Sequence, residues 1–537
     1  MLGLFDIKIA TSASRPYGPL RAGQPQVNTA ADAHEMKDVE LAAPEGIASP
    51  YNTSGRAKRP PRRPQNKRAD SSFLKTATYK DKYLVILEHS LKHGLLVGAG
   101  AHLVLSAIKL AGGLLSLVIA LTSRSKRPTL IKIVSTSFAD AATRRLAGTL
   151  ALFSLIWTAA YPALQKFGLE RDDESDSLID RIVRSLGQQA AASAGFVAGL
   201  ALLVQTRSER VAWAPQIFCR GLYSHLKARP LFHVPNADML LFGCVNAQIL
   251  LGMYVYPDTL EKGYRRWMDK TAQFDHGFLE AYRAGIRGSA PSTRHVELLE
   301  HSVMEHGHPE HVAAWARWKP TMHSCCVPCG LSHRAEPSCL RSNARVLLNA
   351  FLAAMPMYAP VHLLPALIFH GKQFTKAPVV SGQKISLKIA RSCAFLASYV
   401  GLARSAVCWL DAAKSMSGSQ ISAGPWFAAS GALTSATLLW EEPHRRAELA
   451  LYCAPKALES LFFTLSGVGL AASVPFGEVL LACAGTAMLM DCYVHKVNAV
   501  QPLPRALIAQ IADPHLPTSS AHRAHKERRD TTRELLG

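Results

Sequence analysis

A short segment in the second half of the chain carries cysteine and histidine at a spacing that suits metal binding. Cys326, Cys329, His333 and Cys339 form the pattern C-x2-C-x3-H-x5-C. Thiolate and imidazole are ligands that zinc binds tetrahedrally, and four protein ligands leave no position open for a substrate. The segment therefore predicts a structural zinc site. An unmetallated reduced loop and a local disulfide remain open as alternatives.

The same segment does not favour nucleic-acid binding. A retroviral-type zinc knuckle has four residues on each side of its histidine, and base-stacking aromatic residues are missing between these cysteines. No G-x-S-x-G, Walker loop or dinucleotide fingerprint occurs in a strand–turn–helix context. Since no carboxylate–histidine constellation accompanies the cysteines either, we expect a protein that is not an enzyme and does not bind nucleic acid.

The composition indicates a membrane setting for this segment. Hydrophobic residues make up 49% of the 537 residues and charged residues only 18%, with a net charge of +21. An average soluble domain carries roughly 25% charged residues. Five of the eleven cysteines lie in or beside apolar stretches: Cys244, Cys393, Cys408, Cys453 and Cys483. We expect these five to be buried and reduced, so a secreted disulfide framework is not expected.

Eight apolar windows approach or exceed the ~18–20 residues needed to cross a hydrocarbon core of ~30 Å. They are residues 94–122, 146–164, 186–204, 239–256, 346–369, 392–410, 416–440 and a window around 479–490. These windows predict an all-α polytopic membrane protein. Arg404 interrupts one of them and is expected to face the bundle interior or a cavity. Loop charge leaves the orientation open, because the basic N-terminal arm and the basic odd-numbered loops would lie on opposite sides.

The windows fall into two halves that resemble each other. In each half a span leads into a basic turn, an amphipathic stretch, an acidic helix start and a second span. This order predicts two similar four-helix repeats joined by a polar His/Cys-rich loop. Gly195 and Gly199 in the first half, and Gly424 and Ala428 in the second, are spaced to form small-residue faces on which helices pack closely.

Five segments follow from these patterns. They are a disordered basic N-terminal arm (1–84), a first four-helix membrane repeat (85–257), a polar His/Cys-rich connecting region (258–345), a second four-helix repeat (346–512) and a basic C-terminal tail (513–537). The arms are too polar to offset their ordering entropy by burial. We expect them to contact anionic lipid head groups, with a merely solvated tail as the alternative.

Several of these segments resemble the transmembrane protein 135 family, particularly its fungal members. The resemblance rests on residues 326–329 (Cys-Val-Pro-Cys), His333 and 338–339, on the Pro-rich span 355–365, on 236–248 leading to 256–260, and on 447–460. It covers roughly residues 85–515. The family pattern has His-Pro where Arg334 follows His333 here. The repeats of that family are in turn similar to those of the inner-membrane preprotein translocase channel proteins.

The resemblance implies an integral membrane protein of a peroxisome or mitochondrion, related to lipid metabolism and mitochondrial dynamics, with no established catalytic residues. From the residues themselves we expect a protein that moves or gates a solute, lipid or polypeptide between its two repeats. The alternative is a membrane scaffold whose metal-pinned loop recruits protein partners.

Overall fold

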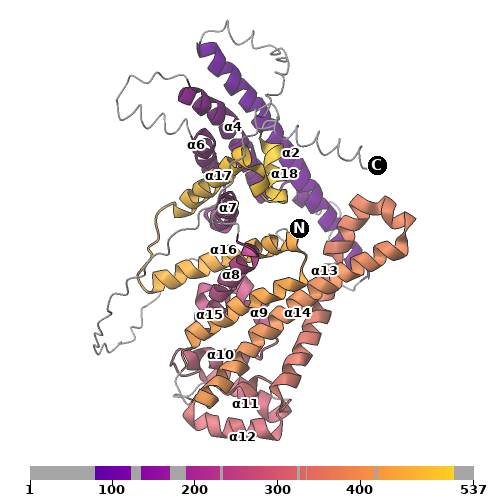
Figure 1. The fold of residues 1–537 in the computed structure, drawn as a ribbon, viewed down its shortest axis with the longest axis vertical. Helices are drawn as coiled ribbons and strands as arrows, with labels where there is room; N and C mark the ends of the chain where they lie inside the picture. The colour runs from indigo at the N-terminus through magenta and orange to yellow at the C-terminus, as the bar shows by residue number, and fades with distance from the viewer. Residues whose placement is uncertain are drawn as a thin grey trace, which may run out of the picture. The chain divides into compact units, whose positions relative to one another are not determined.

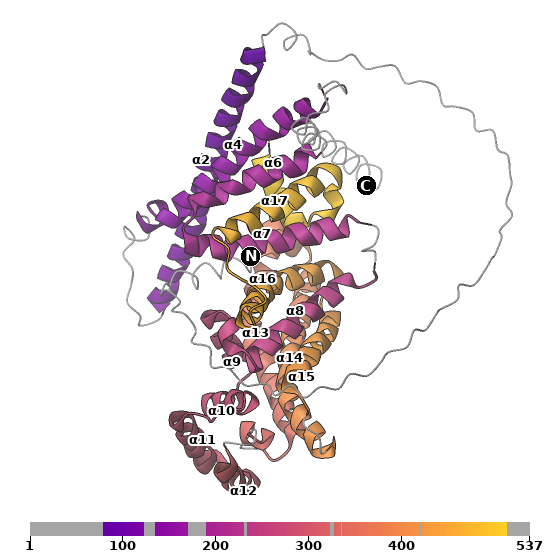
Figure 2. The same cartoon turned by 90° about the vertical axis from the view of Figure 1, so that its left-hand side faces the viewer.

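In a computed structural model, the described residues are 79–122, 135–169, 189–229, 234–322, 327–333, 336–417 and 421–512. Regular structure in these ranges is helical, with no strand among them (Figures 1 and 2). Contacts separate residues 13–85 from the remainder of the chain, and only 79–85 of that unit are described. The predicted arm and tail lie outside the described residues, except that helix α2 already begins at Tyr79.

Six helical segments of the described ranges are long and apolar enough to cross a membrane. They lie in or around α2 (Tyr79–Thr122), α4 (Ala141–Leu169), α8 (Ala237–Tyr254), α13 (Cys339–Lys376), α14 (Pro378–Ser417) and α17 (Gly477–His495). Large apolar side chains such as Leu95 and Leu96 on α2 are 64% and 72% exposed, as lipid contact requires. The chain is therefore an all-α polytopic membrane protein.

The two remaining predicted windows, 186–204 and 416–440, form shorter elements. The first becomes α6 (Ala190–Gly199) followed by the 3-10 turn η1 (Leu200–Val204), and together they make one short apolar helix. The second becomes α15 (Ala423–Leu433) followed by the 3-10 turn η6 (Thr434–Trp440). In both windows the last turns adopt 3-10 geometry, which is narrower than an α-helix and rises further per residue.

The order of elements after α6 recurs in the second half. The first series is α6, η1, α7 (Arg207–Lys227), α8, η3 (Pro257–Thr259) and α9 (Lys262–Thr271); the second is α15, η6, α16 (Pro443–Gly467), α17, η7 (Val497–Ala499) and α18 (Pro502–Ile511). Local details recur too. Asn236 and Phe476, which precede α8 and α17, both adopt left-handed backbone angles (φ 59° and 56°). Asp238 and Glu478 then occupy the first turns of those helices, where a carboxylate is favoured.

The two series exchange one helix with each other. Helix α17 packs against α6 and α7 of the first series, and α8 packs against α15 and α16 of the second (Figure 2). Glycines make both contacts close. A Cβ atom at Gly485 of α17 would lie 2.6 Å from Phe218 Cα of α7, and one at Gly431 of α15 would collide with the Asn246 carbonyl of α8. Neither half can therefore form its observed packing without the other.

Three ion pairs join the two series. Arg210 of α7 donates to Glu478 of α17 at 3.1 Å. Arg220 of α7 donates to Glu448 of α16, also at 3.1 Å, and Lys456 of α16 forms an ion pair with Glu261 ahead of α9. Because these side chains are partly buried, the pairs hold the two series together more firmly than exposed pairs would, and the first of them fixes the exchanged helix α17 against α7.

The connecting region 258–345, predicted as a loop, is largely helical. Besides α9 it holds α10 (His276–Ile286), α11 (Thr293–His306), α12 (Pro309–Trp318) and two 3-10 turns, η4 (Lys319–Thr321) and η5 (Cys329–Ser332). Asp275 caps α10 by accepting from Gly277 N at 2.9 Å. These helices are short and amphipathic, so their apolar residues are spread among polar ones and form no long hydrophobic run.

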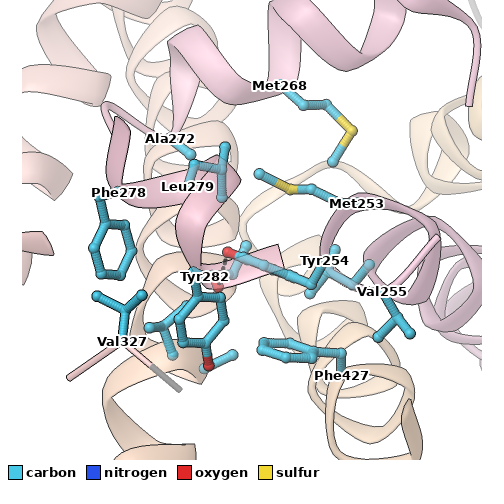
Figure 3. Close-up of a cluster of buried hydrophobic side chains, with 14 of the residues drawn as sticks. Met253, Tyr254, Val255, Met268, Ala272, Phe278, Leu279, Tyr282, Val327 and Phe427 are labelled. Atoms are coloured by element: carbon cyan, nitrogen blue, oxygen red, sulfur yellow. Dashed lines mark hydrogen bonds between the residues drawn. The ribbon is translucent and has the colours of Figure 1, made fainter. Parts of the chain in front are cut away.

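An aromatic core attaches the connecting region to the membrane helices. Tyr254 at the end of α8 stacks on Phe427 of α15 with ring centroids 4.2 Å apart, and Tyr282 of α10 meets Phe427 edge-on (Figure 3). Val327, just before η5, lies beside Phe278 in the same cluster (Figure 3). Val327, which lies between the first two cysteines of the predicted zinc motif, is thereby anchored in the core.

Candidate metal centre

Four potential ligands converge where η5 meets helices α13 and α14. Cys329 begins η5, His333 follows it, Cys339 begins α13, and Cys408 lies on α14. One ligand atom from each residue lies within 4.8 Å of all the others. Cys408 and His333 are buried and the other two partly buried, so the group is shielded from solvent. Such a group of three thiols and one imidazole could hold a metal ion.

The distances between these atoms approach those of a tetrahedral site. Cys329 Sγ and Cys339 Sγ lie 3.8 Å apart, which matches the ~3.8 Å that two sulfurs at ~2.3 Å from zinc would show. His333 Nε2 lies 3.1 Å from Cys339 Sγ, closer than the ~3.5 Å expected around zinc. The nine described cysteines are all free, so none of these thiols forms a disulfide with another described cysteine.

A shared carbonyl orients the imidazole of His333. Because a carbonyl oxygen only accepts, His333 Nδ1–H donates to Glu336 O at 2.9 Å, and His311 Nε2–H donates to the same oxygen at 2.9 Å. His333 Nε2 is then left as the nitrogen that faces the thiols and can bind a metal. The His311 ring packs so closely on Gly330 that a Cβ there would lie 2.8 Å from His311 Nδ1.

The pKa shifts show that negative charge is concentrated at this place. The hydrogen bond that Cys329 donates to Cys408, burial, and the nearby Asp411 and Cys339 all raise the pKa of Cys329. Burial lowers the pKa of His333, but its hydrogen bonds to Cys408 and to the Glu336 carbonyl raise it by more. Adjacent thiolates repel one another unless a cation lies between them, and a bound metal would supply that charge.

Three residues on one face of helix α14 contact η5 and the connecting region around it. Arg404, buried at 3% exposure, donates to Ala272 O, Gln273 O and Ser332 O at 2.8, 2.9 and 2.8 Å. Cys408 follows one turn later. Asp411 accepts from the backbone N of Cys329 at 3.1 Å. Positions spaced by four and three residues lie on one side of a helix, so α14 presents an anchor, a ligand and a cap to the same segment.

The structure brings together three of the four predicted ligands. Cys329, His333 and Cys339 meet as the spacing predicts, whereas Cys326 lies outside the described residues. Cys408 was expected to be an ordinary buried thiol; it is buried, but its sulfur joins the cluster. Only its place in an apolar window marks it in the sequence, and that gives no indication of a ligand. A second group, His225, Asp491 and Cys492, also lies within ligand distance.

The predicted packing residues differ between the halves. A Cβ at Gly195 or Gly199 would lie 2.9 Å from Thr486 O or 2.5 Å from Thr486 Oγ1, so both make the close helix contact that their spacing predicts. Gly424 meets only Leu251 Cδ1, at 3.8 Å, and Ala428 is half-buried. The close approach in the second half is made instead by Gly431, because the partner helix α8 crosses α15 there.

Residues 323–465 match the family model for the N-terminal cysteine-rich region of Transmembrane protein 135. The matched stretch contains all four residues of the cluster. It covers less than half of the chain, and it supports the resemblance to that family. No solved structure matches the chain.

Proposed function

We propose that this chain is a non-enzymatic membrane scaffold in which a structural zinc ion locks the helical connecting region onto α14 for the recruitment of protein partners. The observation that carries this proposal is the convergence of Cys329, His333, Cys339 and Cys408. Four soft ligands leave no vacant position for a substrate, which suits a structural role.

The ligands come from three separate elements, and this supports a locking role. Cys329 begins η5 and His333 follows it, Cys339 begins α13, and Cys408 lies on the last turns of α14, at the same open end of the α13–α14 hairpin. A metal ion bound by all four would tie the connecting region to both long helices at once. The free energy of metal binding would then stabilise this arrangement.

Metal analysis of the full-length protein tests the proposal. We expect about one zinc ion per purified chain and less than about a tenth of that in Cys329→Ser and Cys408→Ser. Cys244→Ser, which alters an exposed thiol on α8 outside the cluster, is the matched control and should retain zinc. Zinc loss in Cys326→Ser with full retention in Cys408→Ser would show that the cluster is not the site.

The organelle and the lipid partners belong to this proposal as well. The family resemblance supports a peroxisomal or mitochondrial membrane and a relation to lipid metabolism. The basic arms are the part of the chain suited to anionic lipid head groups. Co-localisation of the tagged full chain with peroxisomal and mitochondrial markers would test the organelle, and an endoplasmic reticulum or plasma membrane pattern would contradict it.

A second candidate function is the movement of a lipid or solute across the membrane. A buried polar network at the contact of α13, α14 and α16 favours it. Arg445 donates to Glu441, Ser392 and His362 at 3.2, 2.9 and 3.1 Å, while Glu441 Oε1 is buried with no partner among the described residues. Ionisable groups at membrane depth commonly mark a transport path.

Flux into liposomes that contain the purified protein separates the two functions. A transporter should give a flux of lipid or ion that Glu441→Gln, a nearly isosteric neutral variant, alters. No flux of any of the lipids and ions assayed with the wild-type protein would favour the scaffold.

A further inference from the structure

A polar cavity of about 170 Å³ lies where the ends of α7, α16 and α18 meet. Its lining includes Tyr223 and Lys227 from α7, Glu448 from α16, and Asn498, Gln501 and Arg505 in or beside α18. The cavity lies apart from the cysteine cluster. It is smaller than the ~300–1,000 Å³ of pockets for drug-sized ligands, so it suits a small polar group.

Two side chains that line this cavity each have one fully buried polar atom that lacks a hydrogen-bond partner among the described residues. Gln501 is 5% exposed, and its Nε2 is one of these atoms; Glu448 Oε1 is the other. Arg220 fixes both side chains, because its NH1 donates to Glu448 Oε2 at 3.1 Å and to Gln501 Oε1 at 3.5 Å. Leaving these two atoms unpaired is costly, so the Gln501 amide and the Glu448 carboxylate at the cavity wall favour a ligand that would supply the missing partners.

The equivalent place in the first half differs from the cavity in its charged residues. The turns η3 and η7 and the helices α9 and α18 correspond residue by residue, which pairs Asp258 with Asn498, Glu261 with Gln501, and Arg265 with Arg505. In the first half Glu261 pairs with Lys456, and Arg265 donates to Asp258 at 3.2 Å. Acidic residues thus neutralise the basic ones at that place.

In the second half both carboxylates are replaced by neutral amides. Arg505 consequently forms no ion pair with any described carboxylate, and neither does Lys227 at the end of α7. Glu448 is already paired with Arg220. The cavity is left with two unpaired cations and an amide donor, which together favour an anion.

We propose that this cavity binds a phosphate-bearing polar head group that also carries a hydrogen-bond donor such as an ammonium group. Lys227, Arg505 and Gln501 Nε2 would bind the phosphate oxygens, and Glu448 Oε1 would accept from the ammonium. Two amphipathic helices, α7 and α16, supply walls of the cavity, and such helices favour the membrane–water boundary where head groups lie.

Calorimetric titration of the full-length protein in maltoside detergent tests this site. The probes are glycerophosphoethanolamine, which has both groups, and inorganic phosphate, which has only one. We expect the first to bind at least about tenfold more tightly, equivalent to about 1.4 kcal/mol. Equal affinity for both probes would overturn recognition of a head group, and no binding of glycerophosphoethanolamine would overturn the site.

A second test uses variants that introduce into the cavity the carboxylates found at the equivalent place of the first half. Asn498→Asp combined with Gln501→Glu changes one atom per side chain and returns the carboxylates that neutralise the equivalent place. We expect affinity for glycerophosphoethanolamine to fall at least about tenfold, and likewise in Arg505→Gln. Arg265→Gln, at the position equivalent to Arg505 but outside the cavity, should bind like wild type. Undiminished binding in both cavity variants would refute the proposal.

Discussion

Replacing Arg404 by methionine tests whether α14 holds the candidate metal centre through backbone contacts. The guanidinium donates to three backbone carbonyls at 2.8–2.9 Å and lies over the Phe274 ring at 4.5 Å. Methionine keeps much of the apolar stem but removes every donor. Three buried carbonyls, one of them belonging to Ser332 beside His333, would then lose a charged partner.

The expected loss of stability follows from these contacts. A hydrogen bond to a charged group contributes ~1.5–3 kcal/mol, but methionine also avoids the cost of burying a charge. The net destabilisation by Arg404→Met should therefore be about 3–5 kcal/mol, because three buried carbonyls lose their donor at ~1–3 kcal/mol each and the avoided charge burial offsets part of that loss. Zinc affinity should fall about 10- to 100-fold, because the backbone next to His333 loses the contact between Arg404 and Ser332 O that holds it.

Two measurements on the purified full chain check this reasoning. Melting temperature reports the loss of stability, and competition with a zinc chelator reports the affinity. Arg391→Met is the matched control, since Arg391 lies on the same helix and is exposed. Arg404→Lys should restore neither property fully, because one ammonium cannot replace a planar guanidinium. If Arg404→Met matched Arg391→Met in both measurements, the proposed anchoring role would be wrong.

Two further predictions concern helix packing and a buried ion pair. Gly485→Ala should lower the melting temperature, at a cost of ~1–3 kcal/mol, because the new Cβ would lie 2.6 Å from Phe218 Cα. Gly100→Ala, whose Cβ would have nothing within 4 Å, should raise the melting temperature slightly. A similar response in both variants would refute the close contact. Burial raises the pKa of Glu280, but the pairing with Arg283 at 2.7 Å lowers it by more, so the folded pKa lies below the unfolded one. The stabilisation by Glu280 is then present above pH ~4.5 and is lost as pH falls through the folded pKa. The melting temperature of Glu280→Gln should accordingly lie below that of wild type at pH 7 and approach it in acid, and a gap that stayed constant would refute the ion pair.

Hydropathy predicts most of the membrane helices but not the short ones. A long apolar run has few other uses, so six of the eight windows coincide with helical segments able to cross a membrane. The windows at α6 and α15 each divide into an α-helix and a 3-10 turn; η1 packs against α4 and α17, and η6 packs against α14 and α8. The helices α10–α12 are not predicted at all, since short amphipathic segments average to a polar composition.

In the metal cluster, too, sequence predicts the ligands that lie close together along the chain but not the one that lies far away. Cys329, His333 and Cys339 lie close in sequence, so their spacing alone indicates a shared site. Cys408 joins them only because α13 and α14 fold back on each other and bring its turn of α14 to η5. Likewise Gly431 makes its close contact because α8 comes from the other half. A single sequence holds no local signal for contacts that depend on a distant partner.

Two of the attachments between the connecting region and the membrane helices differ in kind. Tyr282 of α10 meets Phe427 of α15 edge-on; Tyr254 of α8 stacks on the same ring and donates to Ala403 O of α14 at 2.8 Å. The cysteine cluster holds η5 against α14 only a turn away from that contact. The aromatic attachment depends on apolar burial and needs no metal, whereas the thiols of the cluster would repel one another once deprotonated, and a bound cation would offset that repulsion. A metal ion would therefore act on the local order of η5 and the start of α13, while the exchanged helices α8 and α17 hold the two halves together independently of it.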